Sequence, residues 1–174
     1  MQLTMKAFMK KVSFSDMHCS LARTLDVMGD WWTPLIVRDV HLGIIRFADL
    51  AEDLGISRNL LTRRLNHLVV KGILQKVAYQ ARPARYDYRL TEKGKELVPP
   101  LLALLAWGDR WAAPEAGPPL KLKHVPCGHR FEAKVVCSSC GEPVEADDVI
   151  ALPGPGGAIA PGTMLVGKML AGVR

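Results

Sequence analysis

The sequence predicts an α+β protein that is mainly helical and carries a small Cys/His module near its C-terminal end. Three observations support this prediction. Apolar residues recur at spacings of three and four through most of the first 112 positions, which is typical of helices. Between residues 73 and 90 they alternate with polar residues instead, as they do in strands. Two short Cys/His clips then follow between residues 124 and 141.

Composition narrows the class of protein. With 49% hydrophobic residues among 174, the chain has enough apolar side chains for one domain and an appendage. Its formal charge of +6 favours a polyanionic partner. We expect no membrane partner and a soluble, cytoplasmic protein, because no apolar run approaches the roughly 20 residues that span a bilayer and the N-terminus lacks the apolar core of a signal peptide. In that compartment cysteines more often bind metal or do redox chemistry than form disulfides.

The N-terminal third predicts a flexible basic arm and two helices. The arm covers residues 1–15 and contains Lys6, Lys10 and Lys11. A helix follows from Cys19, with an apolar face at spacings of three and four. Asp30 is placed to cap a second helix that carries Pro34 in its first turn and ends at Gly43.

Two further helices are predicted to be joined by a tight turn. "RFADLAEDLG" forms the shorter one, and Ser57 caps the second, "SRNLLTRRLNHLVVKG", which Gly72 closes. When Leu61, Leu65 and Leu68 form its buried stripe, four polar side chains point outward. They are Asn59, Thr62, Arg63 and Asn66.

The next segments predict a hairpin, a broken helix and a module. "ILQKVAY" and "RYDYRL" are strands joined by "QARPA", and Thr91 caps a helix that Pro99 and Pro100 must break or kink. "LLALLAWGDRW" continues as a helix that is apolar nearly all round, which favours burial against a two-fold partner over packing within the same chain.

The predicted organisation is a domain at 16–112, a linker at 113–119, a zinc-ribbon-like module at 120–150 and a Gly/Pro-rich tail at 151–174.

Two helices, a tight turn and a hairpin in this order predict a winged helix-turn-helix. Between Ser57 and Leu90 there are eight Lys or Arg residues and one acid, Asp87. A helix fits the major groove of double-stranded DNA, where Arg, Asn and Thr read base edges. Arg82 and Arg85 flank the hairpin tip, which would reach the minor groove or phosphates. The alternative is a solvated basic face without a nucleic-acid partner.

Several stretches between Cys19 and Trp111 resemble the HxlR-type transcriptional regulators: "CSLARTLDVMGDWWTPLIVRDVHLGIIRFADL", "LGIS", "LTRRLNHL", "KGIL", "YRLTEKGKEL" and "AWG". The resemblance implies a MarR-like winged-helix fold and a homodimer held by the first and last helices. It also implies that the helix after "GIS" faces DNA through Ser57, Arg58, Asn59, Thr62, Arg63 and Asn66, with Arg82 and Arg85 in the wing. Trp31 and Val69-Val70 depart from the family pattern and leave the operator sequence open.

Cys19 occupies the position of the family's N-terminal cysteine, which in several relatives senses oxidants or electrophiles. A position near a helix start favours the thiolate that such a sensor needs. The alternative is an inert thiol in the dimer seam.

The two clips predict one structural Zn²⁺ per chain. His124, Cys127, Cys137 and Cys140 follow the spacing H-x2-C and C-x2-C, and tetrahedral zinc requires four such ligands. His129 is the rival of His124 as the fourth ligand. About 30 residues also need a metal to stabilise their fold. The alternative is a metal-free tail with reduced cysteines.

Enzyme signals are weak, because four ligands would leave zinc no open position for a substrate. The expected function is a sequence-specific DNA-binding transcriptional regulator without catalytic residues, which acts as a homodimer on a pseudo-palindromic operator, with repression preferred over activation. The runner-up is a winged-helix and zinc-ribbon module that docks protein or RNA. A zinc-dependent hydrolase is the weaker rival.

Overall fold

The structure of the protein is a computed structural model that describes residues 13–172. The chain divides into two compact units. One comprises Asp30–Ile150, and the other comprises the described residues up to Gly29 together with those from Ala151 onward. Lys6, Lys10 and Lys11 of the predicted basic arm lie outside the described residues.

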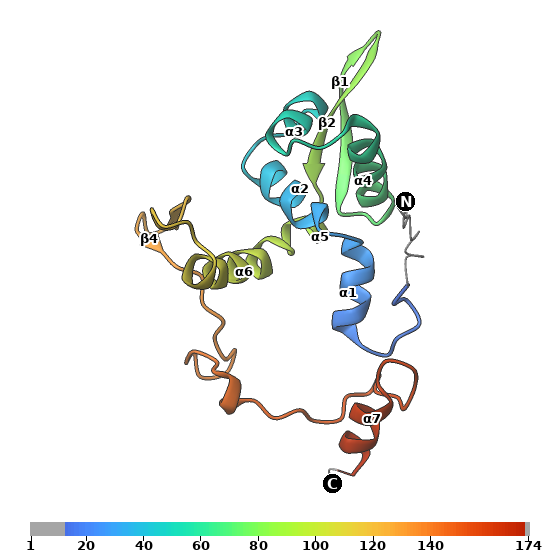
Figure 1. Cartoon of the computed structure of the whole chain (residues 1–174), viewed down its shortest axis with the longest axis vertical. Coiled ribbons are helices and arrows are strands. Elements are labelled where there is room, and N and C mark those ends of the chain that lie inside the picture. Colours follow the sequence, from blue (N-terminus) through green and yellow to red (C-terminus); the bar gives the residue numbers. More distant parts are fainter. Residues whose placement is uncertain (1–12, 173–174) are drawn as a thin grey trace, which may run out of the picture. The chain divides into compact units, whose positions relative to one another are not determined.

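The larger unit contains the helix-turn-helix and its hairpin (Figure 1). Its helices and main strands are α2 (Trp32–His41), α3 (Phe47–Asp53), α4 (Arg58–Val70), β1 (Leu74–Ala81), β2 (Ala84–Leu90), α5 (Glu92–Lys95) and α6 (Val98–Trp111). The winged helix-turn-helix order predicted from the sequence is confirmed.

Side-chain caps fix where these helices begin. Oδ1 of Asp30 accepts the backbone N–H of Trp32 at 3.0 Å, and Pro34 lies in the first turn of α2. The hydroxyl of Ser57 accepts the N–H of Leu60 at 3.4 Å at the start of α4. The predicted end of α2 differs slightly: the helix stops at His41, and Gly43 adopts a left-handed φ of 97° in the turn that follows.

The core lies between α2, α3 and α4. The predicted stripe of α4, Leu61, Leu65 and Leu68, is fully buried. Ile36 of α2 and Leu50 of α3 are also fully buried. Burial of this stripe leaves the opposite face of α4 in solvent, as the helical period requires.

The wing is an antiparallel hairpin whose strands are longer at the tip than predicted. β1 ends two residues later, at Ala81, and β2 begins one residue earlier, at Ala84. A bulge between Ala78 and Gln80 preserves the pairing, so that Gln80 faces Arg85 and Ala81 faces Ala84. The base of the hairpin is fixed to the helices because the N–H of Tyr88 donates to the carbonyl of Ile45 at 2.8 Å. Its tip extends past α3 and α4 (Figure 1).

A break before α6 confirms the effect predicted for Pro99 and Pro100. Thr91 accepts the N–H of Gly94 at 3.1 Å and caps the short α5, and the two prolines then occupy the first turn of α6. Leu104, Trp107 and Trp111 of α6 are 58%, 60% and 71% exposed. This helix therefore keeps a large apolar face uncovered within its own chain.

The remaining elements are short. In the larger unit they are β3 (Leu122–Lys123), β4 (Arg130–Phe131) and the 3₁₀ helix η1 (Ala146–Asp148). The smaller unit contains α1 (Ser20–Met28) and α7 (Met164–Ala171), and the sulfur of Met17 packs beside Gly162. The Gly/Pro-rich tail thus ends in a helix that the sequence analysis did not assign. Among the described residues, no helix has the length and apolarity required to cross a membrane.

Candidate functional site

The outward face of α4 carries the side chains predicted to contact DNA. Asn59, Thr62, Arg63 and Asn66 are all exposed. The Thr62 hydroxyl donates to the carbonyl of Arg58 at 2.8 Å, and Nζ of Lys76 on β1 donates to Oδ1 of Asn66 at 3.0 Å. The wing therefore holds the Asn66 side chain in the C-terminal half of this face, while Asn59 is exposed at its N-terminal end and Arg63 at its centre.

Two basic residues of this region are paired with acids of the same chain. Arg64 is 27% exposed and forms an ion pair with Asp30, the residue that caps α2. Arg89 pairs with Asp87 at 3.2 Å on the same strand. These two arginines have their partners inside the protein, so the surface charge is concentrated on fewer side chains than the sequence count implied.

Three of the exposed arginines line one groove between α3, the start of α4 and the wing. The groove has a volume of about 560 Å³, and its basic residues are Arg46, Arg58 and Arg85. Arg46 lies over the ring of Tyr79 at 5.0 Å, and Arg58 lies over the ring of Phe47 at 5.4 Å. Ring stacking orients both guanidinium groups without neutralising them.

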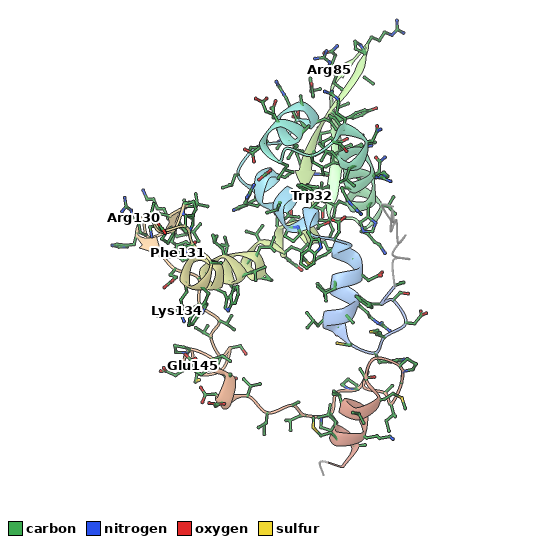
Figure 2. The ribbon with its side chains drawn as sticks, viewed as in Figure 1. Trp32, Arg85, Arg130, Phe131, Lys134 and Glu145 are labelled. Atoms are coloured by element: carbon green, nitrogen blue, oxygen red, sulfur yellow. The ribbon has the colours of Figure 1, made fainter. Side chains whose placement is uncertain are left out.

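The tip of the wing holds the other predicted contact residues. Arg82 is one of the two residues of the turn, and Arg85 follows in β2 near the tip (Figure 2). Both side chains are exposed, and the backbone carbonyl of Arg82 accepts the Gln80 side-chain amide at 3.0 Å. Positive charge thus extends from the groove to the end of the hairpin.

A buried carboxylate lies in α2. Asp39 is 1% exposed and accepts from Nε of Arg38 at 2.7 Å. Burial raises the pKa of Asp39 above its ordinary value, and Arg38 opposes that rise. Arg38 also reaches Asp53 of α3 at 3.4 Å, so this pair connects two helices of the core.

Cys19 is the residue immediately before α1. It is partly exposed, and its carbonyl accepts the N–H of Arg23 at 3.0 Å in the first turn of the helix. The thiol therefore lies at the positive end of the α1 dipole. This is the position that the sequence analysis predicted for it.

The two Cys/His clips each bring a pair of donors together. Nδ1 of His124 is 3.2 Å from Sγ of Cys127. In the second clip the backbone N–H groups of Ser139 and Cys140 lower the pKa of the Cys137 thiol below its ordinary value. The clips are not joined: across residues 13–172, no three His, Cys, Asp or Glu side chains are grouped as a metal site.

Arg46 and Tyr79 were not among the residues predicted from the sequence to line this surface. Arg46 precedes α3 and is 60% exposed, and it reaches the wing through Tyr79 and through Asp87 at 3.9 Å. Counting charges only from Ser57 to Leu90 excluded it. A count that began at the helix-turn-helix itself would have included Arg46, although only the folded hairpin shows which side it faces.

Comparison with known proteins gives consistent results. A model of the HxlR-like helix-turn-helix matches residues 27–116. The HTH-type transcriptional regulator Rv3095 of Mycobacterium tuberculosis is 42% identical over 137 residues, which cover 79% of this chain and 87% of that protein. The matched stretch of 137 residues is longer than the segment that ends at residue 116, where the family match stops. The similarity to Rv3095 therefore extends into the Cys/His segment.

Solved structures agree with the sequence relatives. PA1607, described as a candidate transcription factor, superposes with a TM-score of 0.71 at 33% identity and covers 80% of this chain and 98% of its own. The reduced form of the redox regulator HypR gives a TM-score of 0.50 at 30% identity, covering 53% of this chain and 92% of its own.

These matches are to regulators of transcription rather than to enzymes, and they agree with the exposed α4 face and wing described above. The family match covers more than half of the chain and includes every predicted DNA contact. The protein is a helix-turn-helix transcriptional regulator that belongs to the HxlR family.

Proposed function

We propose that this regulator binds a specific pseudo-palindromic DNA operator as a homodimer and represses transcription there. The observation that carries the proposal is the division of α4 into a fully buried leucine stripe and an exposed face of Asn59, Thr62, Arg63 and Asn66. These side-chain types form base-specific hydrogen bonds in the major groove. A dimer that occupies a promoter needs no further contact to exclude the polymerase.

Affinity comes mainly from the arginine groove and the wing in this proposal. Arg46, Arg58 and Arg85 line one groove, and all three side chains are exposed; Arg46 also lies 3.9 Å from Asp87. Because phosphate contacts position a protein without reading sequence, the groove holds the DNA backbone while α4 reads the bases. Ser57 and Arg82 lie at the two ends of this surface and make backbone contacts.

Dimerisation follows from the uncovered apolar helices. Leu104, Trp107 and Trp111 of α6 are more than half exposed, and Leu21 of α1 is 68% exposed. An apolar patch of this kind is typical of a protein interface. A two-fold partner that covers α1 and α6 would place two α4 helices in successive major grooves, which predicts two half-sites about one helical turn apart.

Cys19 is the residue through which we propose that oxidants or electrophiles control DNA binding. HypR is a redox regulator by name, and Cys19 is the partly exposed residue immediately before α1. Alkylation of the Cys19 thiol by an electrophile, or its oxidation to a disulfide with a second thiol while diamide takes up the two hydrogens, would alter the dimer seam and release DNA. Stoichiometric diamide should abolish operator binding by the wild type and leave the Cys19→Ser variant bound. Unchanged wild-type binding after diamide would contradict redox control.

The experiment that tests the function is selection from a random-sequence DNA pool with the full-length protein. We expect enrichment of a two-fold symmetric site. On that site Arg63→Ala should lose both affinity and discrimination between bases, whereas Arg85→Ala should weaken all sequences alike.

The rival function, a module that docks protein or RNA, gives a different result. It predicts that no symmetric site is enriched and that neither arginine substitution changes DNA binding. Either result would reject operator recognition by the α4 face.

A further inference from the structure

The two Cys/His clips have the same backbone hydrogen bonds. In the first, the N–H of His124 donates to the carbonyl of His129 at 2.9 Å, and the N–H of Gly128 donates back to His124 at 2.8 Å. In the second, the N–H of Cys137 donates to the carbonyl of Glu142, and that of Gly141 donates to Cys137, both at 2.8 Å. The clips are therefore the same turn, formed twice.

Glycine is required at the fifth position of this turn. Gly128 and Gly141 have φ angles of +73° and +78°, in the left-handed region that other residues rarely adopt. The turn places the first and fourth side chains of each clip on the same side. Those side chains are His124 with Cys127 and Cys137 with Cys140, and each pair forms a close side-chain contact.

The spacing within the first pair suits a metal ion. The distance of 3.2 Å from Nδ1 of His124 to Sγ of Cys127 is close to the roughly 3.5 Å expected of two ligands on tetrahedral zinc. His129 has no equivalent place, because it corresponds to Glu142 and closes the turn through its backbone carbonyl.

Each clip ends a small hairpin, and the two hairpins are close in sequence. β3 and β4 pair Leu122 with Phe131 below the first clip. Below the second, Val136 bridges Pro143 and the N–H of Val144 donates to Val135 at 3.0 Å. Arg130 and Phe131 on the first hairpin and Lys134 on the connection are marked in Figure 2. Only residues 132–134 connect the two hairpins. This short connection limits the distance that can separate the two clips.

Nothing in residues 120–150 forms a core, since every side chain of this segment is exposed or only half-buried. Two hairpins of this size are not stable through apolar burial alone. Metal binding supplies folding free energy to small modules of this kind.

We propose that His124, Cys127, Cys137 and Cys140 of one chain bind one Zn²⁺, and that the ion draws the two preformed clips together into a zinc ribbon. The structure has the clips formed but separate, so ion binding orders the module rather than filling a finished cage. Three soft thiolates and one imidazole nitrogen select zinc over magnesium or calcium, which prefer oxygen ligands. With four protein ligands the ion has a structural role.

The test uses two matched histidine substitutions in the full-length protein, purified without added metal. Native mass spectrometry and elemental analysis should find one zinc per chain in the wild type and in His129→Ala. In His124→Ala zinc affinity, measured by competition with a chromogenic chelator, should fall at least about tenfold, because the fourth ligand is lost.

Thiol alkylation provides a second readout that does not depend on the variants folding. In the wild type Cys127, Cys137 and Cys140 should resist alkylation until a chelator removes the zinc, and Cys19 should react independently of chelator. Circular dichroism checks that His124→Ala keeps the helices of the winged-helix part.

Three results would overturn the proposal. They are a wild type that stays metal-free with equally reactive thiols after zinc is added, one zinc per two chains, or loss of zinc from His129→Ala with retention by His124→Ala. None of these measurements uses DNA, so failure of the zinc site is distinguishable from failure of operator binding.

Discussion

Individual arginines of the helix-turn-helix have different roles although they are identical in charge. Arg64 is turned inward to Asp30, which itself caps α2, so its charge stabilises the joint between two helices. Arg63, one residue earlier, is exposed at the centre of the α4 face. The helical period separates these neighbours by about 100°, which is why one is structural and the other is available to DNA.

Arg46 gives a quantitative prediction for the groove. Arg46→Gln removes one charge from the phosphate-facing side and should weaken binding to specific and scrambled duplexes by the same factor. The slope of log affinity against log salt should become shallower by about 0.9 when one phosphate contact is lost. Fluorescence anisotropy over a salt series measures both, and Lys121→Gln, outside the groove, is the control. An unchanged slope would show that Arg46 does not contact a DNA phosphate.

Asp39 predicts a pH dependence of stability. Because burial raises its pKa above the ordinary 3.8, the folded state binds the proton more tightly than the unfolded state. The contribution of this group to the free energy of unfolding therefore falls as pH rises from about 3.8 through the folded-state value, and is constant above it. Asp39→Asn cannot ionise and should lack this decline.

Urea unfolding of the wild type and Asp39→Asn between about pH 4 and 7 tests this assignment, since contributions from other groups cancel in the difference between the two proteins. Parallel curves over that range would mean that the pKa of Asp39 does not rise on folding.

The connection between wing and α5 shows how closely the elements are joined. Thr91 donates to the carbonyl of Gly72 at 2.6 Å, and its N–H donates to Ile73 at 3.0 Å, so the end of the wing is bonded to the end of α4. Gly94 of α5 lies against the same segment: a Cβ added there would be 2.2 Å from the carbonyl oxygen of Ile73. This contact fixes the path of the chain from the wing to α6.

Gly94→Ala should therefore destabilise the protein by about 1–3 kcal/mol, as overpacking of a tight contact does. Gly156→Ala is the matched control, because no atom lies within 4 Å of its added Cβ. Chemical denaturation of both variants measures the difference. Equal stability of the two would show that α5 shifts away from Ile73 at little cost.

At the scale of the whole molecule, the exposed apolar surface of α6 argues against a stable monomer. Trp107 and Trp111 are 60% and 71% exposed, and no residue of α6 is buried within the chain. Burial against a partner would remove this surface from water, which is the main favourable term in association.

Trp107→Glu should convert a dimer into a monomer and weaken operator binding through loss of the second half-site. Val70→Glu, which changes a residue that is 83% exposed outside α6, should leave the oligomeric mass unchanged. Sedimentation equilibrium of both proteins decides between these states. A Trp107→Glu protein that stayed dimeric would exclude α6 from the interface.

Much of the fold could be read from local patterns in the sequence. The buried leucines of α4, the caps at Asp30, Ser57 and Thr91, and the break before α6 depend on residues within a few positions of one another. Such short-range geometry is fixed by the helical period, by capping hydrogen bonds and by the missing N–H of proline. The direction of the α4 face therefore followed from its sequence.

Contacts between segments that are distant in the sequence could not be predicted from local patterns. The pairing of Arg64 with Asp30, the position of Arg46 over Tyr79 and the packing of Met17 beside Gly162 join residues more than 30 positions apart. No periodicity encodes such pairs, because they arise only when separate elements pack. The sequence thus predicted the exposed polar face of α4 that we propose binds DNA, whereas three-dimensional packing determined which of the neighbouring charges have partners within the protein.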